Sequence, residues 1–162
     1  MTEYGKSIRA AYRPELVILI VEDHMLFTKD VKHALPEHAV FFARSVEEAK
    51  ALYAKHLPDV IFLDIDLPDG NGFELLDFFH TQEQEAYVVM LTGSKAENDV
   101  SNAQHKGAKG YIIKPFTRSK IEKYIDEYLI FREQQIKQLL AETENRRNDF
   151  YVLTPDKEVK PE

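Results

Sequence analysis

Three aspartates close a run of branched apolar residues in the stretch VIFLDIDLPDGNG, residues 60–72. The continuous apolar run is typical of a strand that is buried on both faces. Carboxylates at the end of such a strand are able to bind a cation, attack an electrophile or simply begin a turn. Asp64 ends the run and Asp66 lies two residues on, whereas Asp69 belongs to an Asp-Gly-Asn-Gly turn composition. We therefore assign a structural role to Asp69 and keep the other two as candidates for chemistry.

Polar side chains also follow three other apolar runs. Glu22-Asp23 follows ELVILIV, Thr92 ends YVVMLT, and Lys114-Pro115 follows GYII. Taken singly, each has an ordinary structural interpretation, because a strand-end Asp or Thr commonly begins a turn. That interpretation does not explain why polar residues able to act together follow four of the apolar runs.

Alternating strands and helices must position this set. Five apolar runs predict strands at 15–21, 39–43, 59–64, 87–92 and 110–114, and helix-patterned segments lie between and after them. We expect these helices at 24–35, 45–56, 73–80, 96–105 and from Thr117 to about Asn145, with Ser45 as an N-cap and Glu48 completing a capping box. Strict alternation predicts a doubly wound α/β domain with a five-stranded parallel sheet and helices on both faces. In such a domain the carboxyl ends of the strands share one edge, where ligands bind.

Clustered carboxylates at that edge predict a cation site. Carboxylates repel one another unless a cation lies among them, and a set of oxygen donors suits Mg²⁺. A carboxylate beside the metal can act as a nucleophile toward a phosphoryl group, and Asp64 is the best candidate because it ends the central strand. Lys114 and Thr92 would then neutralise and hydrogen-bond the transferred group.

Composition narrows the function class. The chain has 162 residues, a net charge of −7 and no cysteine, so it offers neither a thiolate metal site nor a disulfide framework. The acidic balance and scattered Lys and Arg disfavour direct nucleic-acid binding. The apolar runs are too short to cross a bilayer. We expect a cytoplasmic protein with no membrane partner.

The ordered motifs resemble the receiver domain of bacterial two-component response regulators (CheY-like) over about residues 15–129. The resemblance rests on Glu22-Asp23, on LDIDLPDGNG with Asp64, Pro68 and Gly72, on MLTGS with Thr92, and on GYIIKP with Tyr111, Lys114 and Pro115. It implies a flavodoxin-like sheet with strand order 2-1-3-4-5.

The resemblance also implies roles for these residues. Asp64 would accept a phosphoryl group from a histidine kinase or phosphotransfer protein. Asp23, Asp64 and the backbone carbonyl of Asp66 would hold Mg²⁺, and Glu22 would assist through water. Thr92 and Lys114 would bind the phosphoryl group, Tyr111 would swing inward behind Thr92, and the Lys114-Pro115 bond would be cis. The chain would be a signalling switch rather than an enzyme, limited to self-phosphorylation and autodephosphorylation, and Asp66 would alter the lifetime of the phosphorylated state.

Two alternatives remain. Asp64 and Asp66 also fit the DxD motif of haloacid dehalogenase-like phosphatases, with Thr92 and Lys114 completing the site. That superfamily places its metal-binding acidic pair after the Lys, whereas Glu22-Asp23 precedes it here. The other alternative is an interaction module that works without phosphorylation.

The ends of the chain predict three regions: an N-terminal arm at 1–14, the receiver domain at 15–132, and a helical extension with a mobile tail at 133–162. We expect a stand-alone receiver, although a linker to an output domain would also suit the long last helix. Ile136, Leu139 and Leu140 lie on this extension, either folded back on the domain or paired with a second copy or a partner helix. We assign His24 a structural role. The sequence contains no motif that identifies the downstream partner.

Overall fold

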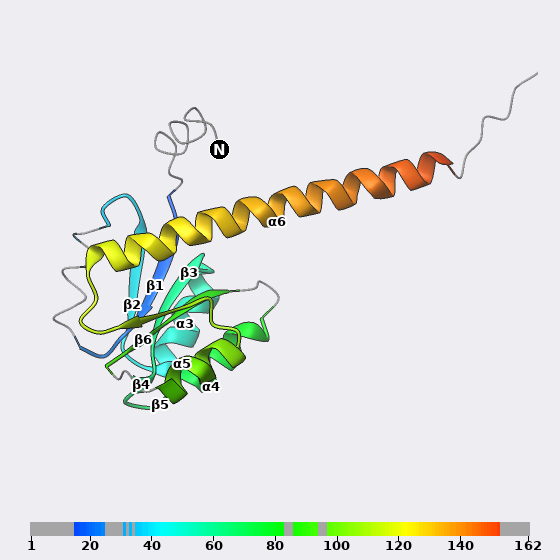
Figure 1. Ribbon diagram of the computed structural model, residues 1–162. Coiled ribbons are helices and arrows are strands. Elements are labelled where there is room, and N and C mark those ends of the chain that lie inside the picture. The colour runs from blue at the N-terminus through cyan, green and yellow to red at the C-terminus, as the bar shows by residue number, and fades with distance from the viewer. Residues whose placement is uncertain are drawn as a thin grey trace, which may run out of the picture. The chain divides into compact units, whose positions relative to one another are not determined.

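A five-stranded parallel sheet forms the centre of the protein (Figure 1). The computed structural model describes residues 15–24, 31, 33, 35–82, 86–93 and 97–152, without the side chains of 97–99 and 147–152. The strand order is β2-β1-β3-β6-β7, which is 2-1-3-4-5 when only these five strands are counted, so the predicted fold is confirmed. The strands are β1 (Val17–Val21), β2 (Ala39–Ala43), β3 (Val60–Asp64), β6 (Tyr87–Thr92) and β7 (Gly110–Ile113).

Four helices and a short hairpin surround the sheet in the described part of the chain. The helices are α3 (Val46–His56), α4 (Gly72–His80), α5 (Glu97–His105) and α6 (Arg118–Val152), and β4 (Asp66–Leu67) pairs antiparallel with β5 (Gly70–Asn71). The predicted arm at 1–14, most of the predicted helix at 24–35, Ser94 and the end of the tail at 153–162 lie outside the described residues.

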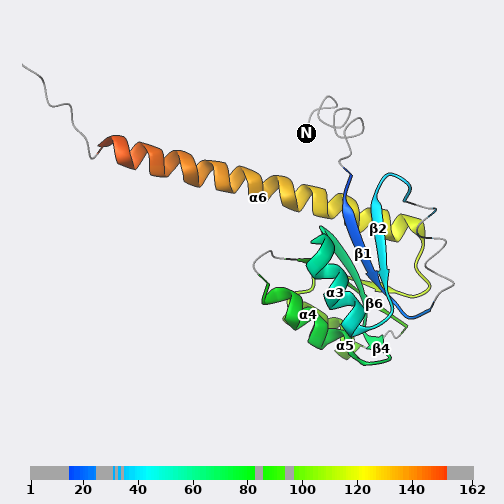
Figure 2. The ribbon, with the colours of Figure 1, turned by 180° about the vertical axis from the view of Figure 1, so that it is seen from behind.

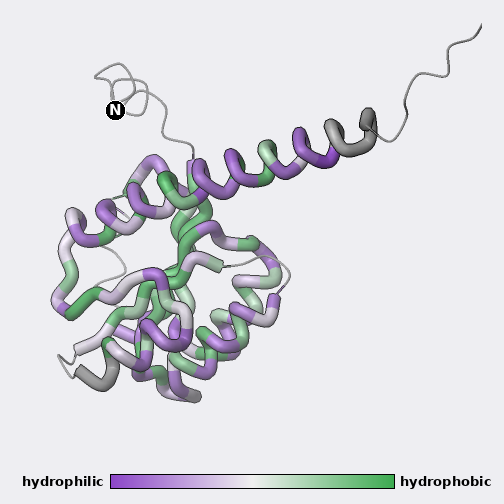
Figure 3. The backbone as a smooth tube through the Cα atoms, turned by 45° about the vertical axis from the view of Figure 1, so that its right-hand side comes forward, coloured by the Kyte–Doolittle hydropathy of each residue, from purple (hydrophilic) through white to green (hydrophobic). Residues whose placement is uncertain are grey.

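The sheet is covered on both faces, which explains why its strands are apolar without alternation. All five residues of β3 are buried. Helices α3, α4 and α5 lie on one side of the sheet, and the first turns of α6, with buried Ile121, lie on the other (Figure 2). The hydrophobic segments of Figure 3 accordingly concentrate in the central strands. The core beneath α3–α5 takes alternate strand residues, namely Leu19, Val21, Ile61, Leu63, Val88 and Met90.

Caps fix the start of α3. Ser45 is the N-cap, and its hydroxyl oxygen accepts a hydrogen bond from the Glu48 peptide N–H at 3.1 Å. The Glu48 carboxylate in turn accepts from the peptide N–H of Arg44, one residue earlier than a regular capping box requires. Asp69 completes the cap from the β4–β5 turn, because its carboxylate accepts from the peptide N–H groups of Val46 at 2.7 Å and Glu47 at 3.1 Å.

The last helix is longer than predicted. It ends at Val152, so the expected end near Asn145 is wrong. No glycine or proline interrupts 118–152, and the next proline is Pro155, so the chain contains no local signal that would end the helix earlier. The protein divides into two compact units, 1–124 and 125–162. No helix among the described residues combines the length and the hydrophobicity needed to cross a bilayer.

Candidate functional site

The predicted site residues stand at the carboxyl ends of four parallel strands. Glu22 follows β1, Asp64 ends β3, Thr92 ends β6 and Lys114 follows β7. Glu22, Asp64 and Thr92 are buried although all three are polar. The pairing of β6 with β7 continues past the strand end, because the Lys114 peptide N–H donates to the Thr92 carbonyl oxygen at 2.7 Å.

Lys114 joins two buried carboxylates. Its ammonium nitrogen lies 2.5 Å from Oδ2 of Asp64 and also forms an ion pair with Oε2 of Glu22. The side chains of Glu22 and Asp64 are 0% and 5% exposed, so this positive charge lies where neither carboxylate is well hydrated. The Lys114–Pro115 peptide bond is cis.

Burial sets the protonation behaviour of this pair. Burial raises the pKa of Asp64 above the ordinary value, and the negative charge of Glu22 adds to that rise, while the hydrogen bond from Lys114 opposes it. Burial acts to lower the pKa of Lys114, but its hydrogen bonds to Asp64 and Glu22 prevail and raise it. Lys114 therefore stays protonated across the physiological range.

A cavity of about 510 Å³ opens beside Asp64. Asp64 and Lys114 therefore face a space large enough for a phosphoryl group. Thr92 is buried and directly precedes Gly93, which lines this cavity. Tyr111 instead lines two smaller cavities, one beside α5 and one beside α6. The residues lining the large cavity are Asp23, His24, Asp64, Asp66, Gly93, Lys114 and Pro115.

Asp66 supports Asp64 through its backbone. The Asp66 peptide N–H donates to Oδ1 of Asp64 at 3.2 Å, while the Asp66 side chain is exposed at the cavity wall. Gly72 lies against the same segment, where a Cβ atom would stand 2.1 Å from the carbonyl oxygen of Asp64. Only glycine therefore fits at the start of α4, which holds the backbone of the nucleophile candidate in place.

Sequence reasoning missed His24 as a site residue. Its Nδ1 lies 2.7 Å from Oδ1 of Asp23 and 3.1 Å from Oε1 of Glu22, and it lines the large cavity. The hydrogen bond with Glu22 and the charge of Asp23 raise the pKa of the imidazole. The only signal in the sequence was its position directly after the acidic pair, and that position does not tell where the side chain points.

The donor set of this site fits Mg²⁺. Glu22, Asp23, Asp64 and Asp66 bring oxygen donors to one edge of the sheet: the last three line the cavity, and Glu22 forms an ion pair with its lysine. Lys114 neutralises only part of their charge, and a hard divalent cation would neutralise more of it.

Comparisons with known proteins agree with this geometry. Residues 18–126, more than half of the chain, match the family described as the response regulator receiver domain. Protein CcdB of Bacillus subtilis is 32% identical over 107 residues, which cover 64% of this chain and 89% of that protein. The sensory transduction protein LytT of Bacillus anthracis is 30% identical over 125 residues, or 75% of this chain and 50% of LytT. The virulence transcriptional regulatory protein PhoP of Salmonella typhimurium is 32% identical over 61% of this chain and 45% of PhoP.

Solved structures show the same likeness. A CheY-like receiver domain protein from Methanospirillum hungatei superposes with a TM-score of 0.69 at 28% identity, covering 75% of this chain and 98% of that one. The chemotaxis protein CheY4 of Vibrio cholerae has a TM-score of 0.65 at 27% identity, covering 70% and 98%. The chain spans about half the length of LytT and of PhoP. From its sequence match, its fold and the residues gathered at the carboxyl edge of its sheet, this chain belongs to the response regulator receiver domain family.

Proposed function

We propose that this receiver domain is a phosphorylation-controlled switch whose phosphoacceptor is Asp64. One observation carries the proposal: the carboxylate of Asp64 stands at the end of the central strand, 2.5 Å from the Lys114 ammonium, at the wall of a cavity of about 510 Å³. The side chain is thus buried enough to be held in one orientation and open enough to be reached by a donor.

The donor is a phosphohistidine on a histidine kinase or phosphotransfer protein. A carboxylate oxygen of Asp64 attacks the phosphorus, the phosphorus–nitrogen bond breaks, and the donor imidazole leaves with the electron pair of that bond. Lys114 stays protonated, and its ammonium group pairs with an oxygen of the transferred phosphoryl group. The hydroxyl group of Thr92 hydrogen-bonds another oxygen of the group.

Asp23, Asp64 and the backbone carbonyl of Asp66 would hold Mg²⁺, with Glu22 acting through water. When bound, the ion supplies charge neutralisation between the acceptor carboxylate and the incoming phosphoryl oxygens. Burial raises the pKa of Asp64, and the hydrogen bond and positive charge of Lys114 oppose that rise, which favours the ionised carboxylate that can attack.

Phosphorylation adds a charge of about −2 at this buried edge, and the response of Thr92, Lys114 and Tyr111 to that charge is the switch. The chain acts on itself by self-phosphorylation and autodephosphorylation, and it passes its signal to a downstream protein in the cytoplasm. The exposed apolar residues Ile136, Leu139 and Leu140 of α6 are available for pairing with a second copy of the chain.

The test is the intact mass after incubation with Mg²⁺ and acetyl phosphate. The parent should gain one phosphoryl group, and Asp64→Asn should gain none. Asp66→Asn is the matched control, because it neutralises a carboxylate at the same cavity wall and should still be phosphorylated. Absence of any adduct in a folded parent would favour a phosphorylation-independent interaction module. Steady phosphate release from simple phosphoesters would favour a phosphatase instead.

A further inference from the structure

The two outer strands of the sheet are treated differently. On β7, the hydroxyl group of Tyr124 hydrogen-bonds both the N–H and the C=O group of Tyr111. On β2, no residue in the described part of the chain bonds the outward backbone groups of Val40 or Phe42. Proteins commonly block such an edge with a charged residue, a proline or a bulge. The strand sequence AVFFA contains neither charge nor proline, and its pairing with β1 is uninterrupted.

The ladder with β1 decides which groups of β2 point outward. The peptide N–H of Ala39 donates to the residue before β1, and the carbonyl oxygen of Ala43 accepts from the residue after β1, both at 2.9 Å. Alternate residues of a strand bond the same neighbour, so Phe41 also faces β1. Val40 and Phe42 therefore present their N–H and C=O groups to the outside.

Local hydrogen bonds limit this open edge at both ends. The peptide N–H of Arg44 donates to the Glu48 carboxylate at 2.8 Å, and that of His38 donates to the Leu35 carbonyl oxygen at 3.2 Å. The stretch that can accept a further strand is therefore short and centred on Phe41.

We propose that two copies of this chain associate through their β2 edges, antiparallel about a twofold axis at Phe41. In that register Val40 of one copy lies opposite Phe42 of the other, and the two residues exchange both N–H···O=C bonds. The twofold axis repeats the pair, as in any isologous contact. The inference goes beyond the proposed phosphorylation switch, because it assigns an interaction surface and its partner to the opposite side of the sheet from β7.

The residues around β2 favour an antiparallel second copy over a parallel one. Exposed Glu37 precedes the strand and exposed Arg44 follows it, so antiparallel copies bring opposite charges together at each end, whereas parallel copies would bring like charges together. Phe41 would face its counterpart as a non-hydrogen-bonded pair, in which side chains approach most closely. Its half-buried ring stacks on His56 with the ring centroids 3.7 Å apart, so an aromatic surface lies beside the axis.

A proline at residue 40 tests the backbone pairing in the full chain. Val40→Pro removes the outward N–H group and no bond to β1, which is the placement that an edge strand tolerates. Sedimentation equilibrium should give a dimer for the parent and a dissociation constant at least about tenfold higher for Val40→Pro, because each copy loses one donor. Val40→Ala is the matched control, since it shortens the same side chain but keeps the N–H group, and its dissociation constant should stay close to that of the parent.

A single cysteine tests the register, because the chain has no cysteine of its own. The Cα atoms of a non-hydrogen-bonded pair stand about 4.5 Å apart, within the range that a disulfide spans. Mild oxidation should therefore convert Phe41→Cys to a covalent dimer at least about tenfold faster than Ala54→Cys, whose thiol would lie at an exposed position of α3. This comparison decides the case if circular dichroism shows that Val40→Pro does not fold.

The contrary outcomes are equally definite. A parent that stays monomeric at its highest soluble concentration would overturn the inference and leave the edge to an extended segment of another protein. Equal oxidation rates for the two cysteine variants would also overturn it, because association through any other surface would crosslink both alike. Neither readout depends on phosphorylation of Asp64.

Discussion

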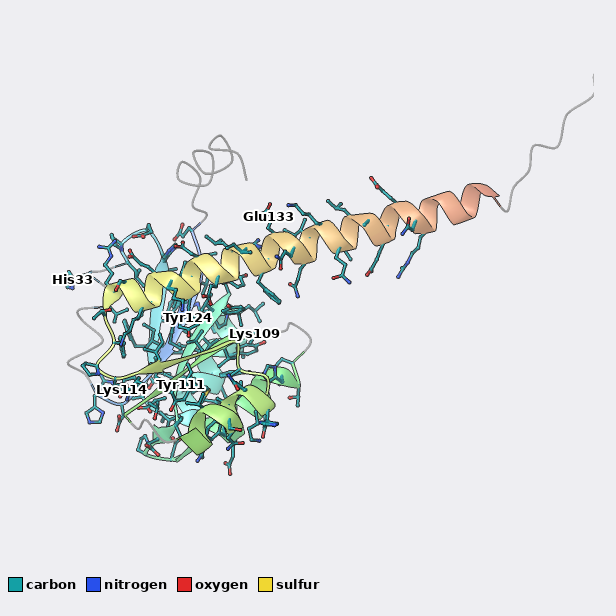
Figure 4. The ribbon with its side chains drawn as sticks, viewed as in Figure 1. His33, Lys109, Tyr111, Lys114, Tyr124 and Glu133 are labelled. Atoms are coloured by element: carbon teal, nitrogen blue, oxygen red, sulfur yellow. The ribbon has the colours of Figure 1, made fainter. Side chains whose placement is uncertain are left out.

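The phenol oxygen of Tyr124 lies 3.2 Å from both the peptide nitrogen and the carbonyl oxygen of Tyr111. It accepts from the first group and donates to the second, so one hydroxyl satisfies both backbone groups of a residue on the outer strand β7 (Figure 4). The ring of Tyr124 lies against Gly110, where a Cβ atom would stand 2.1 Å from a ring carbon. The start of α6 is therefore tied to the strand that carries the proposed switch aromatic.

Tyr124→Phe should weaken this link without emptying the space around it. The ring contact with Gly110 remains, and two hydrogen bonds at a partly exposed strand edge are lost, so the free energy of unfolding should fall by about 1 kcal/mol. Urea denaturation measures that loss. Hydrogen exchange at the Tyr111 amide is the local readout, because its protection should drop while that of central β3 residues falls only by the global change. Unaltered protection at Tyr111 would contradict the role given to the hydroxyl.

Gly72→Ala should disturb Asp64, the proposed phosphoacceptor, through the backbone of that residue. The new Cβ would meet the carbonyl oxygen of Asp64 at 2.1 Å and Cα of Ile65 at 2.9 Å, and main-chain atoms cannot move aside as a flexible side chain can. We expect a destabilisation of about 3 kcal/mol, at the upper end for overpacking, together with slower phosphorylation by acetyl phosphate. Gly93→Ala is the matched control, since nothing lies within 4 Å of its Cβ position and stability should not change. Equal stabilities for the two variants would refute the steric argument.

Lys114→Met should make stability depend on divalent cations. Removing the ammonium leaves the buried carboxylates of Glu22 and Asp64 without their cation, which should cost about 3 kcal/mol in EDTA. Added Mg²⁺ should restore part of that loss in the folded variant, because the ion neutralises the same carboxylates. Lys106→Met is the comparison: it breaks only the partly exposed ion pair with Asp77 and should lose little, with or without metal. Thermal unfolding with and without Mg²⁺ separates the two variants, and a Lys114→Met protein as stable as the parent in EDTA would argue against the charge balance described above.

The stabilisation that the Asp69 carboxylate gives to the start of α3 should be lost in acid. Hydrogen bonds from the peptide N–H groups of Val46 and Glu47 lower the pKa of Asp69 below its ordinary value of 3.8. A carboxylate with a depressed pKa in the folded state stabilises fully above its unfolded pKa, and the contribution disappears as pH falls through the folded value. Asp69→Ala should therefore lower Tm at neutral pH, with the difference from the parent shrinking below about pH 4. A Tm difference that is constant down to strong acid would show that the charge of Asp69 has no part in the cap.

Truncation after Arg132 should reduce self-association of the chain. It removes Ile136, Leu139 and Leu140, whose side chains are 50%, 65% and 60% exposed. A finer test in the full chain is Leu139→Lys, with Gln138→Lys as the matched control at a neighbouring exposed position. Light scattering that gives one mass for the parent, the truncated chain and Leu139→Lys would rule out this stripe as a contact between copies.

The order of apolar runs and helix patterns was sufficient for the fold. A parallel strand buried on both faces needs a continuous run of apolar residues, and an amphipathic helix needs apolar residues with a period near 3.6. Both patterns can therefore be recognised from a short stretch of sequence. The edge of the sheet that carries Glu22, Asp64, Thr92 and Lys114 followed from the same pattern, because parallel strands all end on one side. The end of α6 was misjudged, since Arg146 and Arg147 are good helix formers and neither glycine nor proline occurs between them and Pro155 to end the helix.

Contacts between side chains from distant segments required the tertiary structure. Asp69 was expected to serve only its own turn, yet it caps α3 from 23 positions along the chain. The turning of His24 toward Glu22, the two ion pairs of Lys114 and the bridge from Tyr124 to Tyr111 depend on side-chain rotamers and on how the strands and helices are packed. The sequence alone therefore determined which residues reach the carboxyl edge of the sheet, because hydrophobic periodicity is a local property. The tertiary structure decided which of their atoms are in contact, because those contacts depend on packing angles that no local pattern encodes.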